Sequence, residues 1–304
     1  MRKDSKLSVS VTGIELRHPV MNASGILGDS VEGVRRLIGS GVSAVVTKTL
    51  TLEPREGYLP PILVPLEYGL LNAVGLANPG IDYVETLVRE AHSSGLPIVV
   101  SIGGRDPDEF HVLAVKAFES GADALELNLS CPHTPGYGVD TASTLSTLKA
   151  VADSVKSVTT KPVWAKLGYN RSILDEAGAL LEKGIDALVL INTIPGMAID
   201  VYAKKPILTN RYGGLSGPAI HPVAVYTVYT VYREYRAHIV GAGGALDWVS
   251  ALELILAGAR AVQVGTGFYV KGLRIIEEIL DGIREYMDKT GAKSLEELIG
   301  SAVD

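Results

Sequence analysis

The chain has 304 residues, of which 47% are hydrophobic and 20% are charged, and its formal net charge is −6. This composition is typical of a globular protein with a large core, and the mild negative charge argues against a nucleic-acid-binding protein that uses a broad basic face. The single cysteine permits no internal disulfide, and the first residues lead into no apolar signal segment, so we expect a cytoplasmic protein that does not bind membranes.

Short apolar segments that predict buried strands alternate along the chain with amphipathic segments that predict helices. We expect strands at 19–23, 41–46, 97–101, 121–126, 162–167, 184–189, 237–241 and 258–263. Helices are expected between them, among others at 29–38, 82–92, 107–119, 174–182, 246–257 and 273–286. Every second strand follows a glycine that is typical of a helix C-cap. The spacing of these glycines predicts eight β/α units.

Eight such units predict an α/β fold of the (β/α)8 TIM barrel type. An open, doubly wound parallel sheet is the alternative. No Pro/Ser-rich linker and no run of charge marks a boundary, so we expect a single domain over residues 1–304 with long βα loops at its carboxyl face.

Small, amide-bearing or cationic residues stand at the end of each predicted strand. They are Ser24, Lys48, Ser101, Asn128, Lys166, Asn192, the glycines of the 241–244 turn, and Gly265 with Thr266. The carboxyl ends of barrel strands converge on one mouth, so the pattern predicts a site there. A lysine at the end of an apolar strand is costly to bury unpaired, which favours an anionic or electron-rich ligand, with snorkelling to solvent as the alternative.

Glycine-rich turns follow the last two strands, at 241–244 and 265–267. In barrels these two loops commonly bind phosphate through exposed backbone N–H groups. Ordinary tight turns are the alternative. Two long connections, 50–80 and 192–218, carry amide and hydroxyl side chains, and connections of that length are usually functional.

The single cysteine, Cys131, follows the fourth predicted strand in the run Asn128-Leu129-Ser130-Cys131-Pro132-His133. A thiol at a strand end can act as a base, while a buried, inert cysteine is the alternative. The six histidines form no metal-ligand pattern, so we expect no metal site. The chain has no G-x-S-x-G elbow, and no G-x-G-x-x-G follows its first strand.

The order of these motifs resembles that of the class 1 dihydroorotate dehydrogenases, and among them the B-type catalytic subunit. The resemblance covers nearly the whole chain and rests on Ala23-Ser24-Gly25, Lys48-Thr49, Asn72-Ala73-Val74-Gly75-Leu76, Asn128-Leu129-Ser130-Cys131-Pro132, Lys166, Asn192-Thr193, Gly214-Leu215-Ser216-Gly217-Pro218, Gly243-Gly244 and Gly265-Thr266. It implies a barrel that binds one FMN and oxidises (S)-dihydroorotate to orotate in de novo pyrimidine biosynthesis.

The resemblance also implies roles for individual residues. Cys131 resembles the base that removes the C5 proton while hydride leaves C6 for the flavin, and Lys48 resembles the residue between flavin and substrate. The residues that match FMN-contacting positions are Ser24, Lys48, Thr49, Ser101, Asn128, Lys166, Ile191, Gly217, Gly243, Gly244, Gly265 and Thr266. Those that match substrate-contacting positions are Lys48, Asn72, Ala73, Val74, Gly75, Leu76, Asn128, Asn192 and Thr193. Lys166 is suited to stabilising negative charge on the reduced flavin.

Two positions depart from the family pattern. His133 stands where many members have asparagine, and the related dihydropyrimidine dehydrogenases have histidine there, so a flavin enzyme acting on uracil-type substrates is the alternative function. Ser101 stands where B-type relatives often have asparagine. A further alternative, a non-catalytic barrel that binds phosphometabolites, would explain the glycine turns alone.

The resemblance implies partners as well. B-type members pass electrons to NAD through a second subunit that carries FAD and a 2Fe-2S cluster. One cysteine cannot ligate such a cluster, so we expect a separate iron-sulfur flavoprotein subunit. We also expect a homodimer of catalytic subunits at the core of a heterotetramer.

Overall fold

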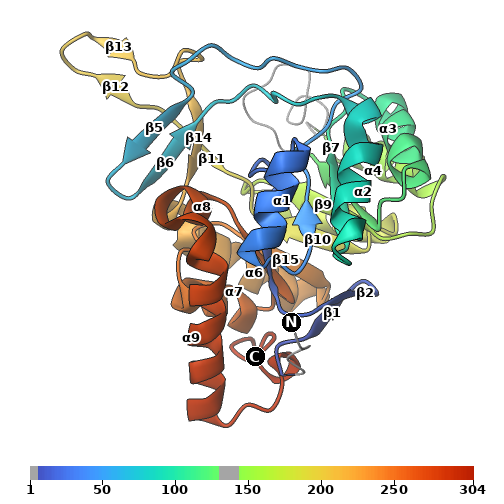
Figure 1. The fold of residues 1–304 in the computed structure, drawn as a ribbon, viewed down its shortest axis with the longest axis vertical. Helices are drawn as coiled ribbons and strands as arrows, with labels where there is room; N and C mark the ends of the chain where they lie inside the picture. The colour runs from blue at the N-terminus through green and yellow to red at the C-terminus, as the bar shows by residue number, and fades with distance from the viewer. Residues whose placement is uncertain (1–5, 130–143) are drawn as a thin grey trace.

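In the computed structural model, which describes residues 6–129 and 144–304, parallel strands alternate with helices along the chain (Figure 1). An eight-stranded sheet forms the centre, in the order β3-β16-β15-β10-β9-β8-β7-β4. Its strands are β3 (Val20–Asn22), β4 (Val45–Val46), β7 (Ile98–Ile102), β8 (Ala124–Asn128), β9 (Val163–Leu167), β10 (Ala187–Leu190), β15 (His238–Ala242) and β16 (Ala261–Val264). Each of the eight strands overlaps its predicted segment, and several begin or end a few residues later than predicted.

The sheet closes between its two outermost strands, β3 and β4. The Ser43 N–H donates to the Val20 carbonyl at 3.0 Å. The Asn22 amide then bridges to Val46, donating to its carbonyl at 2.7 Å and accepting from its N–H at 2.9 Å. A buried side-chain amide therefore completes the pairing where the β4 backbone is short. The barrel prediction is confirmed, and the open sheet is excluded.

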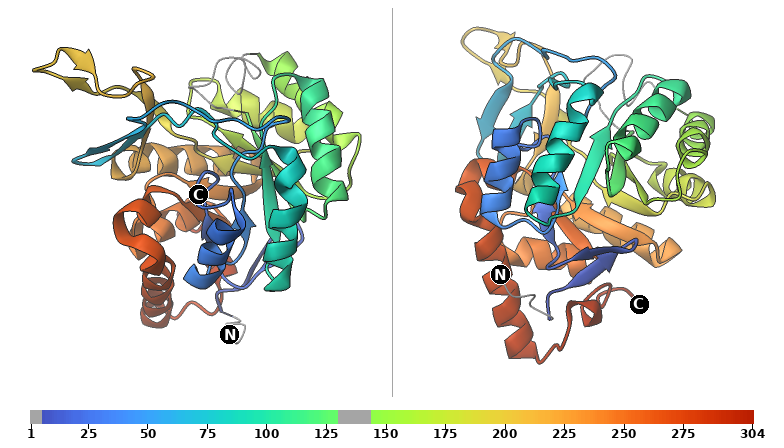
Figure 2. Two further views of the ribbon diagram at one scale, coloured as in Figure 1. Left: turned by 45° about the horizontal axis from the view of Figure 1, so that its top comes forward. Right: turned by 45° about the vertical axis from the view of Figure 1, so that its right-hand side comes forward.

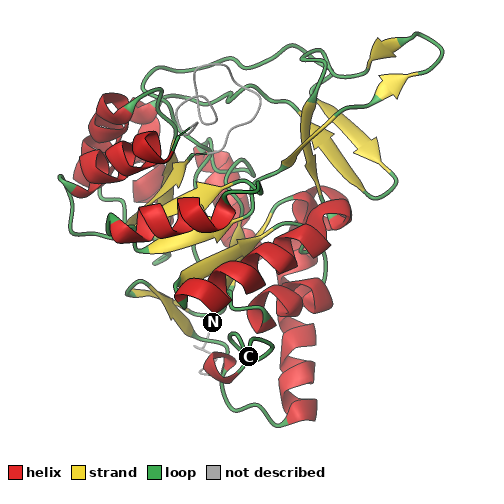
Figure 3. Ribbon diagram, turned by 180° about the vertical axis from the view of Figure 1, so that it is seen from behind, coloured by secondary structure: helices red, strands yellow, loops and turns green. Residues whose placement is uncertain are grey.

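Helices cover the outside of the barrel (Figure 3). They are α1 (Val31–Ser40), α2 (Val84–Ser93), α3 (Pro107–Glu119), α4 (Leu145–Lys156), α5 (Ile173–Glu182), α6 (His221–Tyr235), α7 (Trp248–Leu256), α8 (Thr266–Lys271) and α9 (Ile275–Thr290). Short 3-10 turns are η1 (Ile81–Tyr83), η2 (Pro218–Ile220), η3 (Gly272–Arg274) and η4 (Leu295–Glu297). Throughout the described residues, no helix is long and apolar enough to cross a bilayer.

Capping residues fix where individual helices begin. The Asp106 side chain accepts from the Glu109 N–H at 2.8 Å, so α3 begins at the expected residue. The helix expected from residue 246 begins instead at Trp248, because Asp247 and Ser250 form a capping box. The last long helix continues to Thr290 and ends at a left-handed glycine, Gly291.

Strand register determines which side chains face the interior of the barrel. Successive side chains point to opposite faces of a strand, so residues two apart share a face. The register pairs Ser101 with Glu126, Glu126 with Trp164, and Asn128 with Lys166. These five side chains therefore share the inner wall, with Trp164 one layer below Lys166 on β9.

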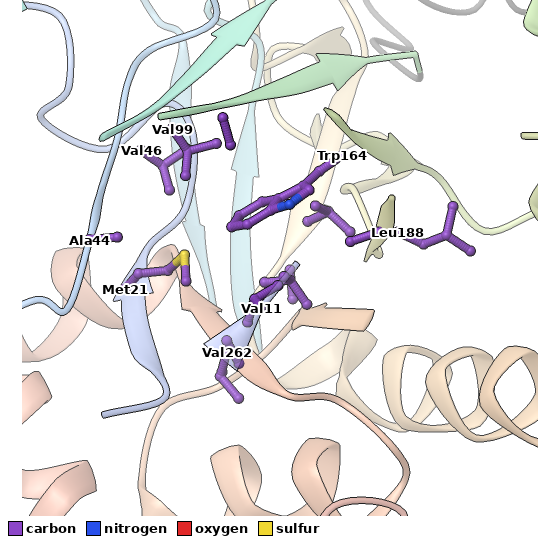
Figure 4. Packing of buried hydrophobic residues seen from close by; sticks show 14 of the residues in the cluster. Val11, Met21, Ala44, Val46, Val99, Trp164, Leu188 and Val262 are labelled. Atoms are coloured by element: carbon purple, nitrogen blue, oxygen red, sulfur yellow. The ribbon is translucent and has the colours of Figure 1, made fainter. Parts of the chain in front are cut away.

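The amino end of the barrel is closed by the hairpin of β1 (Val9–Val11) and β2 (Ile14–Leu16). Figure 4 shows Val11 packed among inner-wall side chains that include Met21 and Trp164. The hairpin turn is fixed by hydrogen bonds at Thr12, whose hydroxyl accepts from the Trp164 indole at 2.9 Å and whose N–H donates to His238 at 3.0 Å. The interior of the barrel at its amino end, called the lower layer here, is thus filled with packed apolar side chains, and the layer at the carboxyl end is called the upper layer.

The two long connections expected as loops contain strands. They form a four-stranded antiparallel sheet in the order β11-β14-β6-β5. Its strands are β5 (Leu63–Leu66), β6 (Gly69–Asn72), β11 (Ile194–Gly196) and β14 (Gly213–Ser216). A further hairpin of β12 (Ile199–Asp200) and β13 (Lys205–Pro206) extends away from the body of the molecule (Figure 2). The sequence did not predict this sheet, because its strands are short and pair across 142 residues of chain at Asn72 and Gly214.

Candidate active site

A cavity of about 330 Å³ lies at the carboxyl ends of the barrel strands, beside the four-stranded sheet. Most residues predicted for the site line it. These are Ser24, Lys48, Thr49, Asn72, Val74, Gly75, Leu76, Asn128, Lys166, Ile191, Asn192, Thr193, Gly217, Gly243, Gly244, Gly265 and Thr266. The structure therefore brings together side chains that are far apart in the sequence, as the barrel prediction requires. Their individual roles stay predictions.

Of the predicted residues that the structure describes, Ser101 and Ala73 do not line this cavity. Ser101 is fully buried beneath it, where its hydroxyl lies 3.0 Å from that of Thr49. Ala73 is buried in the small sheet, where it packs with Val64 and Leu71. Cys131 lies outside the described residues, as does His133.

A chain of polar contacts runs down from the cavity into the barrel. The Asn192 amide donates to Asn128 Oδ1 at 3.3 Å, and the Asn128 amide donates to Thr49 Oγ1 at 3.1 Å. The Thr49 hydroxyl in turn lies 3.1 Å from that of Ser24 and 3.0 Å from that of Ser101. Each side chain thus orients the next, which fixes the donors and acceptors that face the cavity.

A cation, an amide and a carboxylate form the floor of the cavity and the layer beneath it. Lys166 Nζ donates to Gln263 Oε1 at 3.0 Å, and Gln263 Nε2 donates to Glu126 Oε2 at 2.6 Å. Lys166 Nζ also lies 3.6 Å from Glu126 Oε1. Lys166 and Gln263 line the cavity, whereas Glu126 lies below them and is fully buried.

The turn after β15 contributes two glycines, Gly243 and Gly244, to the cavity wall. Gly243 and Gly244 have φ values of +123° and +73°, in the left-handed region that favours glycine. A Cβ on Gly244 would lie 2.6 Å from the His221 Cβ, so a side chain does not fit there. The His221 ring holds this turn by donating from Nδ1 to the Gly243 carbonyl at 2.8 Å.

The segment between β6 and η1 is shaped by its own amides. Asn78 donates to the Leu76 carbonyl at 2.7 Å and to the Thr51 hydroxyl at 2.9 Å, and its Oδ1 accepts from the Gly80 N–H at 2.8 Å. Asn72 donates to the Gly214 carbonyl at 3.1 Å, which ties this segment to β14. The backbone of Gly75 and Leu76 is thereby held against the cavity.

Glu126 and Gln263 are not among the site residues predicted from the sequence. Each stands in a strand that is otherwise apolar, two residues before a predicted site residue, Asn128 or Gly265. Period-two alternation from those residues would have placed both on the inner wall. Other cavity-lining residues that were not predicted for the site are Ala23, Gly25, Ile26, Leu63, Leu70, Ser216, Ile220, Ala242 and Tyr269.

Comparison with known proteins identifies relatives that match almost end to end. A family model described as dihydroorotate dehydrogenase matches residues 6–287. A Pyrococcus abyssi protein named dihydroorotate dehydrogenase B (NAD(+)), catalytic subunit, is 44% identical over 299 residues, covering 98% of this chain and 99% of that one. An Aeropyrum pernix protein named putative dihydroorotate dehydrogenase A (fumarate) is 44% identical over 303 residues, 99% of each chain.

A solved structure shares the fold. The dihydroorotate dehydrogenase of Eimeria tenella in complex with ferulenol superposes with a TM-score of 0.85 at 22% identity, covering 99% of this chain and 89% of that one. At this identity the likeness bears on the fold alone, and it agrees with the barrel described above.

Proposed function

The chain belongs to the dihydroorotate dehydrogenase family, and from that premise we propose that it is the catalytic subunit of a B-type enzyme that oxidises (S)-dihydroorotate to orotate in de novo pyrimidine biosynthesis. The observation that carries the proposal is the cavity, where most of the predicted flavin and substrate residues meet at one end of the barrel. The relatives named B-type catalytic subunits support the NAD-linked form. The predicted single domain and cytoplasmic location belong to the same proposal.

The cavity has the features that FMN requires. The turn at Gly243 and Gly244 brings glycine backbone to the cavity wall, which suits a phosphate. Lys166 at the cavity floor suits the pyrimidine end of a flavin, where negative charge develops on reduction. A bound FMN would supply the acceptor for the hydride that leaves C6 of the substrate. We propose that the residues matched by the resemblance hold it.

The substrate would lie against the segment that follows β6. Lys48 supplies a cation for the orotate carboxylate, and Asn72, Asn192 and Thr193 supply hydrogen-bonding groups for the pyrimidine edge, all of them at the cavity wall. The hydrogen bonds from Asn192 to Asn128 and from Asn72 to Gly214 restrict how these amides turn. Preorganised amides cost little free energy to orient when the substrate binds.

Cys131 is proposed as the base that takes the C5 proton. It lies outside the described residues, but it follows Asn128 and Leu129 at the carboxyl end of β8. General-base catalysis is worth about 10²- to 10⁴-fold in rate. Cys131→Ala is therefore expected to bind FMN normally and to lose at least about a hundredfold in kcat. Wild-type turnover in an FMN-loaded Cys131→Ala variant would remove Cys131 from this role.

The electrons are proposed to reach NAD through a partner subunit that carries FAD and a 2Fe-2S cluster, since one cysteine cannot ligate the cluster. We also propose a homodimer of this chain at the core of the complex. The β12–β13 hairpin supports an intersubunit contact, because two apolar side chains in its turn are largely exposed: Tyr202 has 95% of its surface accessible and Val201 has 73%. The name of the Aeropyrum relative makes fumarate the acceptor to test against NAD.

The proposal is tested by anaerobic mixing of the FMN-loaded protein with substrate. Dihydroorotate is expected to bleach the flavin absorbance within the time of one catalytic turnover. Dihydrouracil is expected to leave the absorbance unchanged. Bleaching by dihydrouracil alone would instead support the uracil-type alternative raised by His133. If NAD reoxidises the reduced flavin only after an iron-sulfur flavoprotein is added, the proposed partner subunit is supported. If fumarate reoxidises the flavin of the isolated chain, the need for a partner subunit is contradicted.

A further inference from the structure

Glu126 is a charged group at the centre of the barrel for which the proposed chemistry has no role. Its side chain has 0% exposure and lies on the inner wall of β8, one layer below Asn128. Carboxylates are almost never fully buried unless they are paired. In the described part of the chain, Glu126 is the only acidic residue with no exposed surface.

The partners of Glu126 come from strands around the barrel. β8 and β16 lie on opposite sides of the eight-stranded order, so the 2.6 Å hydrogen bond from Gln263 to Glu126 crosses the interior. The Ser101 hydroxyl donates to Glu126 Oε1 at 3.4 Å from the neighbouring strand β7. Lys166 Nζ lies 3.6 Å from the same oxygen. Three donors thus surround its two oxygens, an arrangement that suits the carboxylate, which accepts hydrogen bonds and carries no proton of its own to place.

The geometry of Gln263 follows from the charges on either side of it. Its carbonyl oxygen accepts from the Lys166 ammonium and its NH2 group donates to the Glu126 carboxylate, and the reversed amide would oppose both groups. The amide therefore links the cation of the cavity floor to the anion beneath it. Lys166 is held at two points, one direct and one through Gln263.

From this network we propose that Glu126 is a positioning residue for the redox site: its carboxylate fixes Lys166 and offsets its charge, and so keeps the reduction potential of the bound flavin lower than a lone lysine would. The inference rests on the proposed function, because Lys166 can affect the flavin potential only if FMN binds in this cavity. Because Glu126 has no exposed surface and Lys166 has only 6%, water screens the interaction of their charges weakly. Removing the carboxylate should leave a net positive floor that favours the negatively charged, reduced flavin.

The first test measures the flavin potential. In Glu126→Gln holoenzyme we expect reduced FMN to bind about tenfold more tightly relative to oxidised FMN, which raises the two-electron midpoint potential by about 30 mV. The matched control is Glu109→Gln, which neutralises another buried carboxylate, paired with Arg105 and absent from the cavity lining, and should leave the potential unchanged. An unchanged or lowered potential in Glu126→Gln would overturn the proposal.

The second test needs no flavin. Lys166→Met leaves the buried Glu126 carboxylate without its cation, whereas the double variant Lys166→Met/Glu126→Gln removes both charges. We expect the double variant of the apoprotein to melt at least about 3 °C above the Lys166→Met single variant. A double variant that melts at or below the single one would contradict an ionised, paired Glu126.

The two tests separate the inference from the proposed function. If the wild-type protein binds no FMN, the function fails, and the melting comparison still reports on the ion pair. If FMN binds and dihydroorotate reduces it, but the potential of Glu126→Gln matches that of wild type, the function stands and the role of Glu126 fails. Should Glu126→Gln not fold alone, the order of the two melting temperatures still tests the ion pair on which the proposal depends, and a double variant that melts at or below the single one overturns it.

Discussion

The two ends of the barrel are built from the same strands but contain opposite chemistry. On β9, Trp164 packs in the apolar lower layer, while Lys166, two residues later, lies in the polar floor of the cavity. At the amino end the β1–β2 hairpin closes the interior (Figures 1 and 4). At the carboxyl end the four-stranded sheet borders a cavity. This difference predicts that substitutions in the lower layer affect mainly stability, and that substitutions in the upper layer affect mainly the proposed ligand chemistry.

The histidines of the lower end fit this division. The His18 Nε2–H donates to the Gly41 carbonyl at 2.8 Å, and Nδ1 accepts from the Val20 N–H at 3.3 Å. Both bonds are made by the neutral ring. Burial, together with the nearby Arg17, lowers the pKa of His18 to about 4, and burial also lowers the pKa of His238. These rings serve packing and hydrogen bonding in their uncharged form.

The largest effect on stability is expected from Trp164→Ala. This change empties the centre of the lower layer and removes the hydrogen bond to Thr12. It should lower the free energy of unfolding by about 3–5 kcal/mol in denaturant titrations. The control Trp164→Phe keeps most of the buried ring and should cost markedly less. A Trp164→Ala variant as stable as wild type would contradict the prediction that substitutions in the lower layer affect mainly stability.

At the upper end, Lys48→Ala should affect catalysis and leave stability almost unchanged. Loss of the cation proposed to meet the substrate carboxylate is expected to reduce kcat/KM by about a hundredfold, which corresponds to about 2.7 kcal/mol. The thermal midpoint should stay within a few degrees of wild type, because the side chain is only partly buried. Unfolding of this variant with normal kcat/KM in the folded fraction would contradict the assignment.

The smallest effect, when it is taken over a single pH unit, is the pH dependence of stability caused by His18. Because the folded pKa of His18 is about 4 and the ordinary value is 6.5, the unfolded chain binds its proton more readily. Stability should therefore be fully present above pH 6.5 and decrease by up to about 1.4 kcal/mol per pH unit as pH falls toward 4. His18→Gln should flatten this dependence between pH 6.5 and 4, measured by urea titration. An identical slope in the two proteins would exclude His18 as its source.

Local signals in the sequence were sufficient to predict the barrel. Glycines such as Gly41 and Gly184, each followed by an apolar run, mark where a helix ends and a buried strand begins, and both features lie within a few residues of each other. Because the carboxyl ends of barrel strands converge, the prediction placed Lys48, Asn128 and Lys166 at one mouth of the barrel, and in the structure all three line the cavity there.

The remaining features depend on contacts that a local pattern does not contain. The small sheet pairs Asn72 with Gly214, and its strands include exposed apolar residues such as Leu63. Glu126 and Gln263 are 137 positions apart in the chain, and only barrel closure brings them across the interior to each other. A carboxylate in an apolar strand was visible in the sequence, but its partner was not.

The central claim is that the polar upper layer is a flavin site resting on an apolar scaffold. It is tested most directly by a crystal structure of the protein loaded with FMN and orotate. We expect the isoalloxazine ring above Lys166 and Gln263, the phosphate at the Gly243–Gly244 turn, and orotate beside Lys48. Electron density for FMN elsewhere on the molecule, or a cavity that does not take up FMN at saturating concentration, would contradict the account.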